Sequence, residues 1–147
     1  MRFMMIVKAN EQSEAGVFPS PELLAAMGKF NEEMVKAGIL LAAEGLQATS
    51  KGARVVFSGG KRKVIDGPFT ESKELIAGFW LIQVKSKEEA IEWASRCPAP
   101  HGEQADGEIE IRQVFEASDF PTDIFPAEEV SREQAMREEI QKRAAKP

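Results

Sequence analysis

Two short segments that are apolar at consecutive positions limit the possible folds of this 147-residue chain more than any other feature. They span residues 3–7 (FMMIV) and residues 79–84 (FWLIQV). A strand with one face in water alternates apolar and polar residues, whereas a strand that is covered on both faces is apolar throughout. We therefore expect both segments to be strands at the centre of a sheet, with both faces of the sheet buried.

Two amphipathic helices are predicted to accompany these strands. Ser20 is a suitable N-cap for the first helix, Pro21 fits its first position, and Gly38 suits the left-handed residue after its end. Its apolar stripe has the helical period and consists of Leu23, Met27, Phe30 and Met34. Ser86 and Glu89 form the capping-box pattern that predicts the start of the second helix.

Further strands are predicted between and after the helices. Residues 39–49 have an extended pattern. Residues 55–57 and 64–65 flank Gly59-Gly60, a pair that suits a tight hairpin turn. Residues 109–115 alternate between apolar and polar side chains, which predicts a half-exposed strand near the edge of a sheet.

The predicted order is strand, helix, strand, hairpin, strand, helix, strand, with a polar loop at residues 10–16. This order is typical of an α+β protein with a ferredoxin-like antiparallel sheet and two helices on one face. Two helices cover only that face, yet the central strands are apolar on both. A second copy of the chain is the simplest cover for the other face, so we expect a homodimer.

Composition and charge narrow the possible functions. The chain is 43% hydrophobic, which suffices for one core, and its net charge of -5 argues against binding to nucleic acid. Because Cys97 and His101 are the sole cysteine and histidine, we expect no disulfide, no metal and no cofactor. The apolar segments are too short for a membrane span or a signal peptide, so we expect a cytoplasmic protein with no membrane partner.

The composition changes from Phe120 onward, where prolines interrupt regular structure. Residues 131–134 (SREQ) form a capping-box pattern that predicts the start of a final helix. Acids precede bases by four residues in the pairs Glu133–Arg137, Glu138–Lys142 and Glu139–Arg143. Only Met136 and Ile140 form an apolar stripe, so we expect this helix to bury little.

The most conspicuous local motif is Asp66-Gly67-Pro68-Phe69-Thr70-Glu71. Asp66 can accept hydrogen bonds from N–H groups two or three residues later, and Gly67 and Pro68 favour a fixed turn. One interpretation is a rigid turn that follows the hairpin. The other is that the turn presents the carboxylate of Asp66 or Glu71 to a cleft as a general base, with Gly67, Pro68 and Phe69 beside it.

Other candidate ligand-binding residues lie outside this motif. Glu44 and Gln47 flank a bend in the second strand and either line the same cleft or face solvent. Arg112, on the exposed face of the last strand, either binds an anionic ligand or forms a structural ion pair. His101 is interpreted as a solvated loop residue and Cys97 as core filling.

The segment Asp66–Glu74 (DGPFTESKE), followed by Gly78–Ile82 (GFWLI) and Glu108–Arg112 (EIEIR), resembles the DGPF branch of the YCII-related proteins. The resemblance covers residues 1–118, which predicts a domain there and an extension over residues 119–147. It implies a dimeric α+β barrel, in which two ferredoxin-like sheets pack face to face. The broader relatives resemble muconolactone-isomerase-like enzymes, for which a catalytic His/Asp pair has been suggested.

The resemblance places the aspartate of that pair at Asp66, whereas the position of the histidine falls at Met27, so the pair is incomplete in this chain. Genes of this branch are found beside those of extracytoplasmic-function sigma factors, which implies a regulatory connection. We therefore expect a homodimeric protein that binds or transforms a small organic molecule in a cleft beside the turn. The alternative is a non-catalytic interaction module with a protein partner such as a sigma factor.

Overall fold

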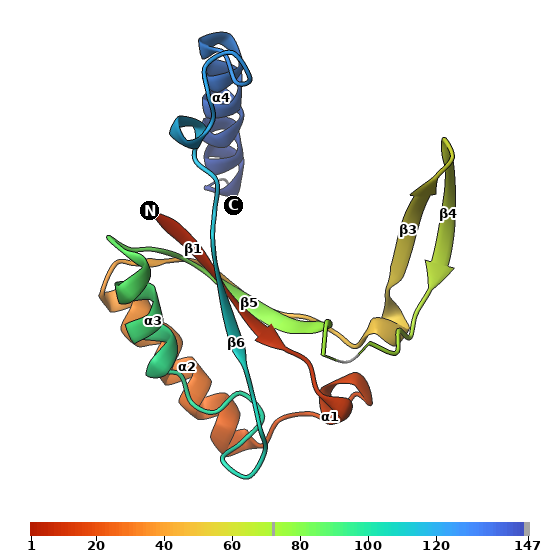
Figure 1. Ribbon diagram of the computed structural model, residues 1–147. Helices are drawn as coiled ribbons and strands as arrows, with labels where there is room; N and C mark the ends of the chain where they lie inside the picture. Colours follow the sequence, from red (N-terminus) through yellow and green to blue (C-terminus); the bar gives the residue numbers. More distant parts are fainter. Residues whose placement is uncertain (72, 146–147) are drawn as a thin grey trace. The chain divides into compact units, whose positions relative to one another are not determined.

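The computed structural model describes residues 1–71 and 73–145, and it divides into two compact units, residues 1–114 and residues 115–147. The elements of the first unit, shown in Figure 1, are β1 (Arg2–Lys8), α1 (Glu11–Glu14), α2 (Pro21–Lys36), β2 (Leu40–Gly45), β3 (Ala53–Ser58), β4 (Lys61–Asp66), β5 (Ile76–Gln83), α3 (Lys87–Ser95) and β6 (Ile109–Gln113). The second unit contains α4 (Ala127–Ala144).

The main sheet of the first unit is antiparallel, with strand order β2-β5-β1-β6. The two consecutively apolar segments form the central strands β1 and β5, as predicted. Helices α2 and α3 cover one face of the sheet (Figure 1), which confirms the α+β, ferredoxin-like arrangement. Because β2 and β6 are edge strands, the sheet of the single chain is open and is not closed into a barrel. Strands β3 and β4 pair in a separate sheet.

The core lies between the helices and one face of the sheet. Phe3 and Ile82 are fully buried and lie opposite each other in β1 and β5. Phe30 of α2 packs edge-on against Trp80 of β5, with ring centroids 5.7 Å apart. The Trp80 indole N–H donates to Oδ1 of Asn31 at 2.7 Å, so its polar atom is satisfied where the ring is buried. The apolar stripe of α2 therefore anchors the helix layer.

Local sequence signals explain most helix ends. The Ser20 hydroxyl accepts from the N–H of Leu23, and the Ser86 hydroxyl accepts from the N–H of Glu89, so both predicted N-caps are confirmed. Gly38 has a φ of 73°, a left-handed conformation that suits glycine after a helix end. The strand after it ends at Gly45, and its register irregularity falls between Leu40 and Ala42.

The prediction of an irregular loop over residues 10–16 was wrong, because these residues include the short helix α1. Asn10 and Ser13 bond each other reciprocally: each side-chain oxygen accepts from the other residue's backbone N–H. This capping box forms one helical turn that has no apolar stripe. A pattern based on hydrophobic periodicity could not detect it.

The second face of the main sheet carries four half-buried apolar side chains. Met4 lies opposite Leu81, and Ile6 lies opposite Phe79, in the register of β1 and β5. We call these four residues the open face. Since α2 and α3 pack against the alternate residues of both strands, they leave the open face uncovered in the single chain. The predicted surplus apolar surface is therefore present.

The second unit has its own small aromatic cluster and a solvated helix. Phe120 contacts the rings of Phe115 and Phe125, with centroids 4.9 and 5.6 Å away. The final helix was predicted to start at residues 131–134, but α4 begins at Ala127, where Glu128 and Glu129 favour the positive end of the helix dipole. Two predicted ion pairs form, Glu133–Arg137 and Glu139–Arg143. Across residues 1–71 and 73–145, no helix has the length and apolar character needed to cross a membrane.

We expect deletion of residues 121–147 to leave the fold of the first unit intact. Met136 and Ile140 are exposed, and no residue of α4 is buried, so the deletion removes little apolar burial. The thermal midpoint and the far-ultraviolet circular dichroism of the truncated chain check this result. A shortened chain that failed to fold would show that the first unit depends on contacts of the second.

Candidate functional site

The conspicuous motif lies at the base of the hairpin formed by β3 and β4. Gly59 and Gly60 close the other end of the hairpin with φ angles of 57° and 76°, as a two-residue primed turn requires. The predicted hairpin and its Gly-Gly turn are thus confirmed. Residues 66–71, which we call the DGPF turn, begin at the last residue of β4 and contain a cis Gly67–Pro68 peptide bond.

A chain of hydrogen bonds connects the DGPF turn to α1. The Glu14 carboxylate accepts from the N–H of Thr49 at 3.1 Å and from the Thr49 hydroxyl at 2.5 Å. The Thr49 Oγ1 in turn accepts from the N–H of Phe69 at 3.0 Å. A carboxylate that accepts from two donors holds them more firmly than a neutral acceptor does. Glu14 lies 35 residues before Thr49, and Thr49 lies 20 residues before Phe69, so the turn is held by segments that are distant in sequence.

Gly67 is packed directly against the backbone of the segment that contains Thr49. Its N–H donates to the carbonyl oxygen of Gly52 at 3.0 Å. A Cβ atom at position 67 would lie only 1.7 Å from the carbonyl oxygen of Thr49. The turn therefore needs glycine at this position because of the close approach of two backbone segments.

Arg54 of β3 contacts two further residues of the turn, Phe69 and Glu71. Its guanidinium carbon lies 3.8 Å from the centroid of the Phe69 ring, a cation–π contact. Its Nη1 also lies 3.6 Å from a carboxylate oxygen of Glu71. Phe69 and Glu71 are thus brought together by one arginine, and the charge of Glu71 has a partner within the turn.

Asp66 differs from its neighbours in the turn. Its side chain is exposed, and among residues 1–71 and 73–145 it has no hydrogen-bond or ion-pair partner. The acceptor role predicted for Asp66 is therefore not seen in the described part of the chain, where Thr49 holds the turn instead. The Asp66 carboxylate is accessible, and Pro68 is exposed beside it.

Glu44 and Arg112 lie at opposite edges of the sheet. Glu44 is an exposed residue of β2 opposite Phe79, and Arg112 is an exposed residue of β6 opposite Met4. Both side chains therefore lie on the same side of the sheet as the open face. Three strand spacings of about 4.8 Å separate them, so a ligand that contacted both would need to span roughly 14 Å. Gln47 is exposed in the segment after β2.

Arg112 has a structural ion-pair partner. Its Nη1 lies 3.3 Å from Oε2 of Glu110, and Lys8 Nζ lies 3.5 Å from the other oxygen of the same carboxylate. The hydrogen bond from Arg112, followed by the charge of Lys8, lowers the pKa of Glu110. The Glu110 carboxylate is therefore ionised, and it forms ion pairs with both Lys8 and Arg112.

A shallow groove of about 310 Å³ lies between α3 and β6 and not beside the DGPF turn. Its lining includes the apolar side chains of Ile91, Ala94, Ile109 and Ile111 and the polar side chains of Ser95 and Glu108. This groove does not include residues of the DGPF turn.

Cys97 and His101 have structural contacts. Burial raises the pKa of the Cys97 thiol to about 12, so it is protonated at neutral pH, and its Sγ lies 3.8 Å from the Sδ of Met27. The prediction of core filling fits this contact. His101 is half-buried and its Nε2 lies 2.8 Å from the carbonyl oxygen of Lys8, so the prediction of a solvated side chain was wrong. Among the described residues, no cluster of three or more His, Cys, Asp or Glu side chains could hold a metal.

Sequence reasoning missed the residues that hold the DGPF turn in place. Glu14 was interpreted as part of a polar loop, Thr49 as the end of an extended segment, and Arg54 was not considered. Their contacts with the turn join positions far apart in the chain, and no local pattern marks them. A covariation signal between distant positions is the kind of information that would identify such pairs.

Comparison with known proteins assigns most of the chain to a family. The sequence model of the YCII-related domain matches residues 1–118, a range that contains β1 to β6 and the DGPF turn. An uncharacterized protein of Rhizobium meliloti (strain 1021) is 26% identical over 116 residues, which cover 77% of this chain and 94% of that relative. The chain therefore belongs to the family of proteins with a YCII-related domain.

Proposed function

We propose that the protein is a homodimer that binds a small organic molecule next to the DGPF turn, with the partner copy supplying the walls that the single chain lacks. The observation that carries this proposal is the open face. Met4, Ile6, Phe79 and Leu81 form an apolar centre that α2 and α3 leave uncovered. A protein that leaves such a surface uncovered usually buries it against a partner.

The charged residues around the open face support a face-to-face dimer. Glu44 lies on one edge strand, and Glu110 and Arg112 lie on the other, at positions that share the face of Met4 and Phe79. An apolar centre with a charged rim is the usual composition of a protein interface. Two open faces packed about 10 Å apart would give the dimeric α+β barrel that the sequence resemblance implies.

The DGPF turn supports ligand binding because its backbone is held by long-range contacts while one carboxylate stays accessible. Thr49 and Gly67 fix the turn, and Asp66 is exposed at its start. A site that is rigid before the ligand arrives loses less entropy on binding. Asp66 would serve as a hydrogen-bond acceptor or a general base toward the ligand, with Pro68 beside it.

Light scattering and a thermal-shift screen test the proposal together. We expect a mass of about 32 kDa, twice the 16.2 kDa of the chain, at micromolar concentration. We also expect at least one member of a panel of small carboxylic acids and lactones to raise the thermal midpoint, because a ligand that binds only the folded state stabilises it. A folded monomer would refute the dimer, and a full panel without a shift would refute the ligand site.

The substitutions Asp66→Asn and Asp66→Ala assign the role of the carboxylate. Since Asp66 is exposed, we expect each to lower stability by no more than about 1 kcal/mol. The thermal shift produced by the best ligand of the panel should disappear in both variants. Lys63→Ala, another exposed residue of β4, is the matched control and should keep the shift. Asp66 variants that respond like the wild type would exclude Asp66 from the site.

The second unit favours another candidate function, that of a non-catalytic interaction module. Met136 and Ile140 of α4 are exposed one helical turn apart, and they suit the helix-in-groove recognition of a protein partner. A sigma factor is the partner class that the sequence resemblance implies. Under this hypothesis, the intact chain binds a protein partner in a mixture of purified proteins. The chain without residues 121–147 still folds but no longer binds that partner.

A further inference from the structure

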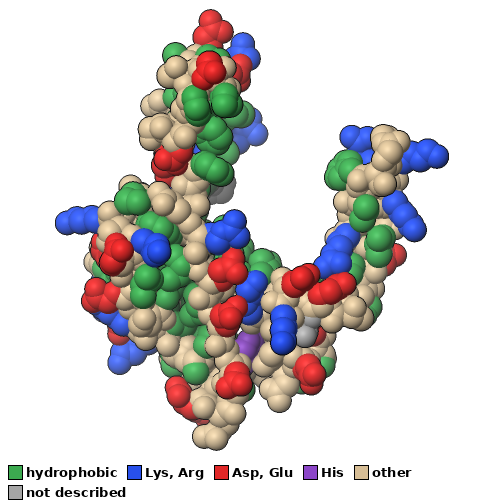
Figure 2. All heavy atoms as spheres, viewed as in Figure 1, with side chains coloured by type: hydrophobic (Ala, Val, Ile, Leu, Met, Phe, Trp, Pro, Cys, Tyr) green, Lys and Arg blue, Asp and Glu red, His purple; other side chains and the backbone are tan. Residues whose placement is uncertain are grey.

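The hairpin of β3 and β4, residues 53–66, has one strongly apolar face. Val55 lies opposite Val64 in the register, and Phe57 lies on the same face. Their side chains are 52%, 64% and 68% exposed, in that order. Figure 2 shows hydrophobic side chains exposed along the hairpin. We call residues 53–66 the arm, and Val55, Phe57 and Val64 the arm face.

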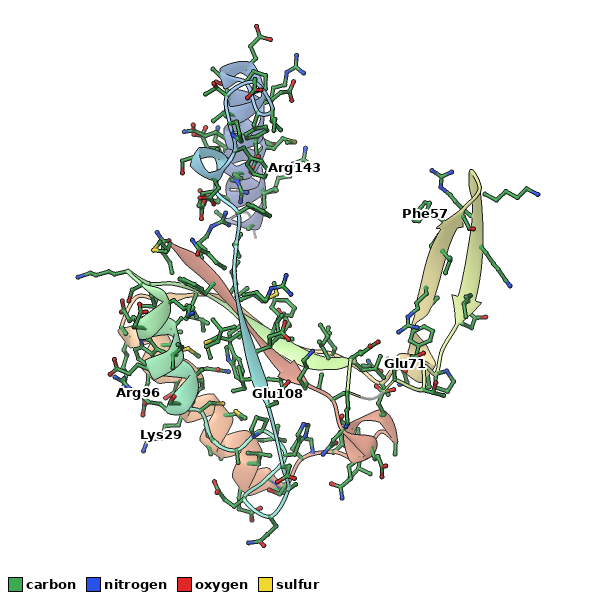
Figure 3. All side chains as sticks on the ribbon, viewed as in Figure 1. Lys29, Phe57, Glu71, Arg96, Glu108 and Arg143 are labelled. Atoms are coloured by element: carbon green, nitrogen blue, oxygen red, sulfur yellow. The ribbon has the colours of Figure 1, made fainter. Side chains whose placement is uncertain are left out.

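The arm is also basic, although the chain is acidic as a whole. It contains four bases, Arg54, Lys61, Arg62 and Lys63, and one acid, so its net charge is +3, against -5 for the full chain. Three of these bases are consecutive and follow the Gly59-Gly60 turn at the tip of the arm. The Arg62 guanidinium lies 4.9 Å from the centroid of the Phe57 ring, so charge and apolar surface adjoin at this tip. Figure 3 labels Phe57 there.

The groove between α3 and β6 combines apolar side chains with neighbouring acids. Its lining includes the apolar side chains of Ile91 and Ala94 from α3 and of Ile109 and Ile111 from β6, together with the polar side chain of Ser95. Residues 103–110 supply four acids and no base, namely Glu103, Asp106, Glu108 and Glu110. Glu110 is paired with Lys8 and Arg112, whereas the other three are exposed and have no ion-pair partner in the described part of the chain. Figure 3 labels Glu108 on this segment.

We propose that the arm of one copy docks on the α3–β6 groove of a second copy, so that the arm face covers the apolar side chains of the groove and Arg62, which shares the arm face, pairs with the acids Glu103, Asp106 and Glu108. This proposal rests on the homodimer proposed above and adds a second contact to it. Two isologous contacts of this kind form at once, because a twofold axis that brings one arm to one groove brings the other arm to the other groove.

The dimensions of the arm fit this contact. Each of its strands has six residues, so the arm is about 20 Å long. Two packed sheets are about 10 Å apart, so an arm that leaves one sheet is long enough to pass the edge of the other. The groove borders β6, which is an edge strand and is therefore accessible from the side.

The arm combines apolar and basic side chains, and a second copy of the chain fits this combination better than a nucleic acid does. Bases alone would suit a phosphate backbone, but the arm face would then stay in contact with water and charge. An isolated two-stranded hairpin is at best marginally stable in water, so an exposed arm gains from an apolar partner surface. The groove offers apolar side chains from α3 and β6, and residues 103–108 add acids without an ion-pair partner in the described part of the chain.

Two neighbouring valines on opposite faces of β3 give a matched test. Val55→Asp places a charge on the arm face, whereas Val56→Asp places the same charge on the other face of the arm. We expect Val55→Asp to raise the dimer dissociation constant at least about 10-fold and Val56→Asp to change it less than about 3-fold. Sedimentation equilibrium over a dilution series measures both constants.

A charge exchange tests the partner surface. We expect Arg62→Glu to weaken the dimer at low salt, and Glu108→Arg to weaken it similarly. The chain with both substitutions should recover most of the lost affinity, because the opposite charges meet again. Lys29→Glu makes the same change in net charge as Arg62→Glu at an exposed position on α2 and should leave the constant unchanged.

The outcomes separate this proposal from the homodimer itself. A wild-type monomer at every concentration would refute the dimer and the arm contact together. A dimer that Val55→Asp and the charge reversals leave unchanged would refute the arm contact alone. If such a dimer bound a labelled DNA duplex through Arg62 and Lys63, the arm would be a nucleic-acid contact and the proposal would be overturned.

Discussion

Ile82→Glu is expected to unfold the protein, whereas Leu81→Glu is expected to leave the chain folded and separate the dimer. Ile82 is fully buried in the core beneath α2 and α3, and Leu81 belongs to the open face. A buried unpaired charge costs several kcal/mol, which approaches the total stability of about 5–15 kcal/mol of a domain. At position 81 the same charge stays in water in the monomer and is buried only in the dimer.

Circular dichroism and light scattering distinguish the two substitutions. We expect Ile82→Glu to lose the cooperative thermal transition, and Leu81→Glu to keep it with a mass near 16.2 kDa and a dissociation constant raised at least about 100-fold. Leu24→Glu, at an exposed leucine of α2, is the control and should preserve both fold and mass. A Leu81→Glu chain that remained dimeric would show that the subunits meet through some other surface.

The architecture of the main sheet could be predicted from the sequence because its signals are local. Ser20 and Ser86 mark helix starts through bonds to N–H groups three residues away. The consecutive apolar residues of β1 and β5 reveal that both sheet faces are apolar, whichever residue faces the helices. The pattern alone did not decide which of Leu81 and Ile82 faces the helices; the structure shows that Ile82 belongs to the core beneath them and that Leu81 lies on the other face.

The support of the DGPF turn could not be predicted because it depends on contacts between distant segments. Asp66, Gly67 and Pro68 predict a turn by their own conformational preferences. The acceptor that holds the turn is Thr49, and Thr49 is held by Glu14, which lies in a helix too short to have a hydrophobic period. Asp66 is the last residue of β4 and begins the DGPF turn, but the hydrogen bond that holds the turn comes from Thr49 and not from Asp66 as the sequence suggested.

The placement of the remaining candidates also required the strand order. Glu44 and Arg112 were both predicted near the sheet, and each is on an edge strand with the same orientation as the open face. Nothing in a single sequence fixes whether strands that are 68 residues apart adjoin or lie at opposite edges, since strand order is set by packing of the whole domain. Arg112 meets Glu110, two residues away, which is the structural pairing that the sequence allowed.

Gly67→Ala is expected to disrupt the DGPF turn and to lower the thermal stability of the protein. The new Cβ would lie 1.7 Å from the Thr49 carbonyl oxygen, far inside van der Waals contact, so one of the two backbone segments must move. Thr49 is held by two bonds to Glu14, so the movement breaks the bonds of Gly67 to Gly52 and of Phe69 to Thr49. Two lost hydrogen bonds correspond to about 2 kcal/mol, or roughly 5–10 °C in thermal midpoint.

Gly45→Ala is the matched control, because a Cβ at position 45 meets no atom within 4 Å. We expect it to leave the thermal midpoint within about 2 °C of the wild type. Hydrogen exchange locates the damage: the Phe69 amide should exchange much faster in Gly67→Ala, while the Trp80 amide in the centre of the sheet should stay protected. The shift by a ligand from the thermal screen should vanish with the turn, since Asp66 would no longer be held in place. A Gly67→Ala chain with a protected Phe69 amide would contradict the close approach of the two segments.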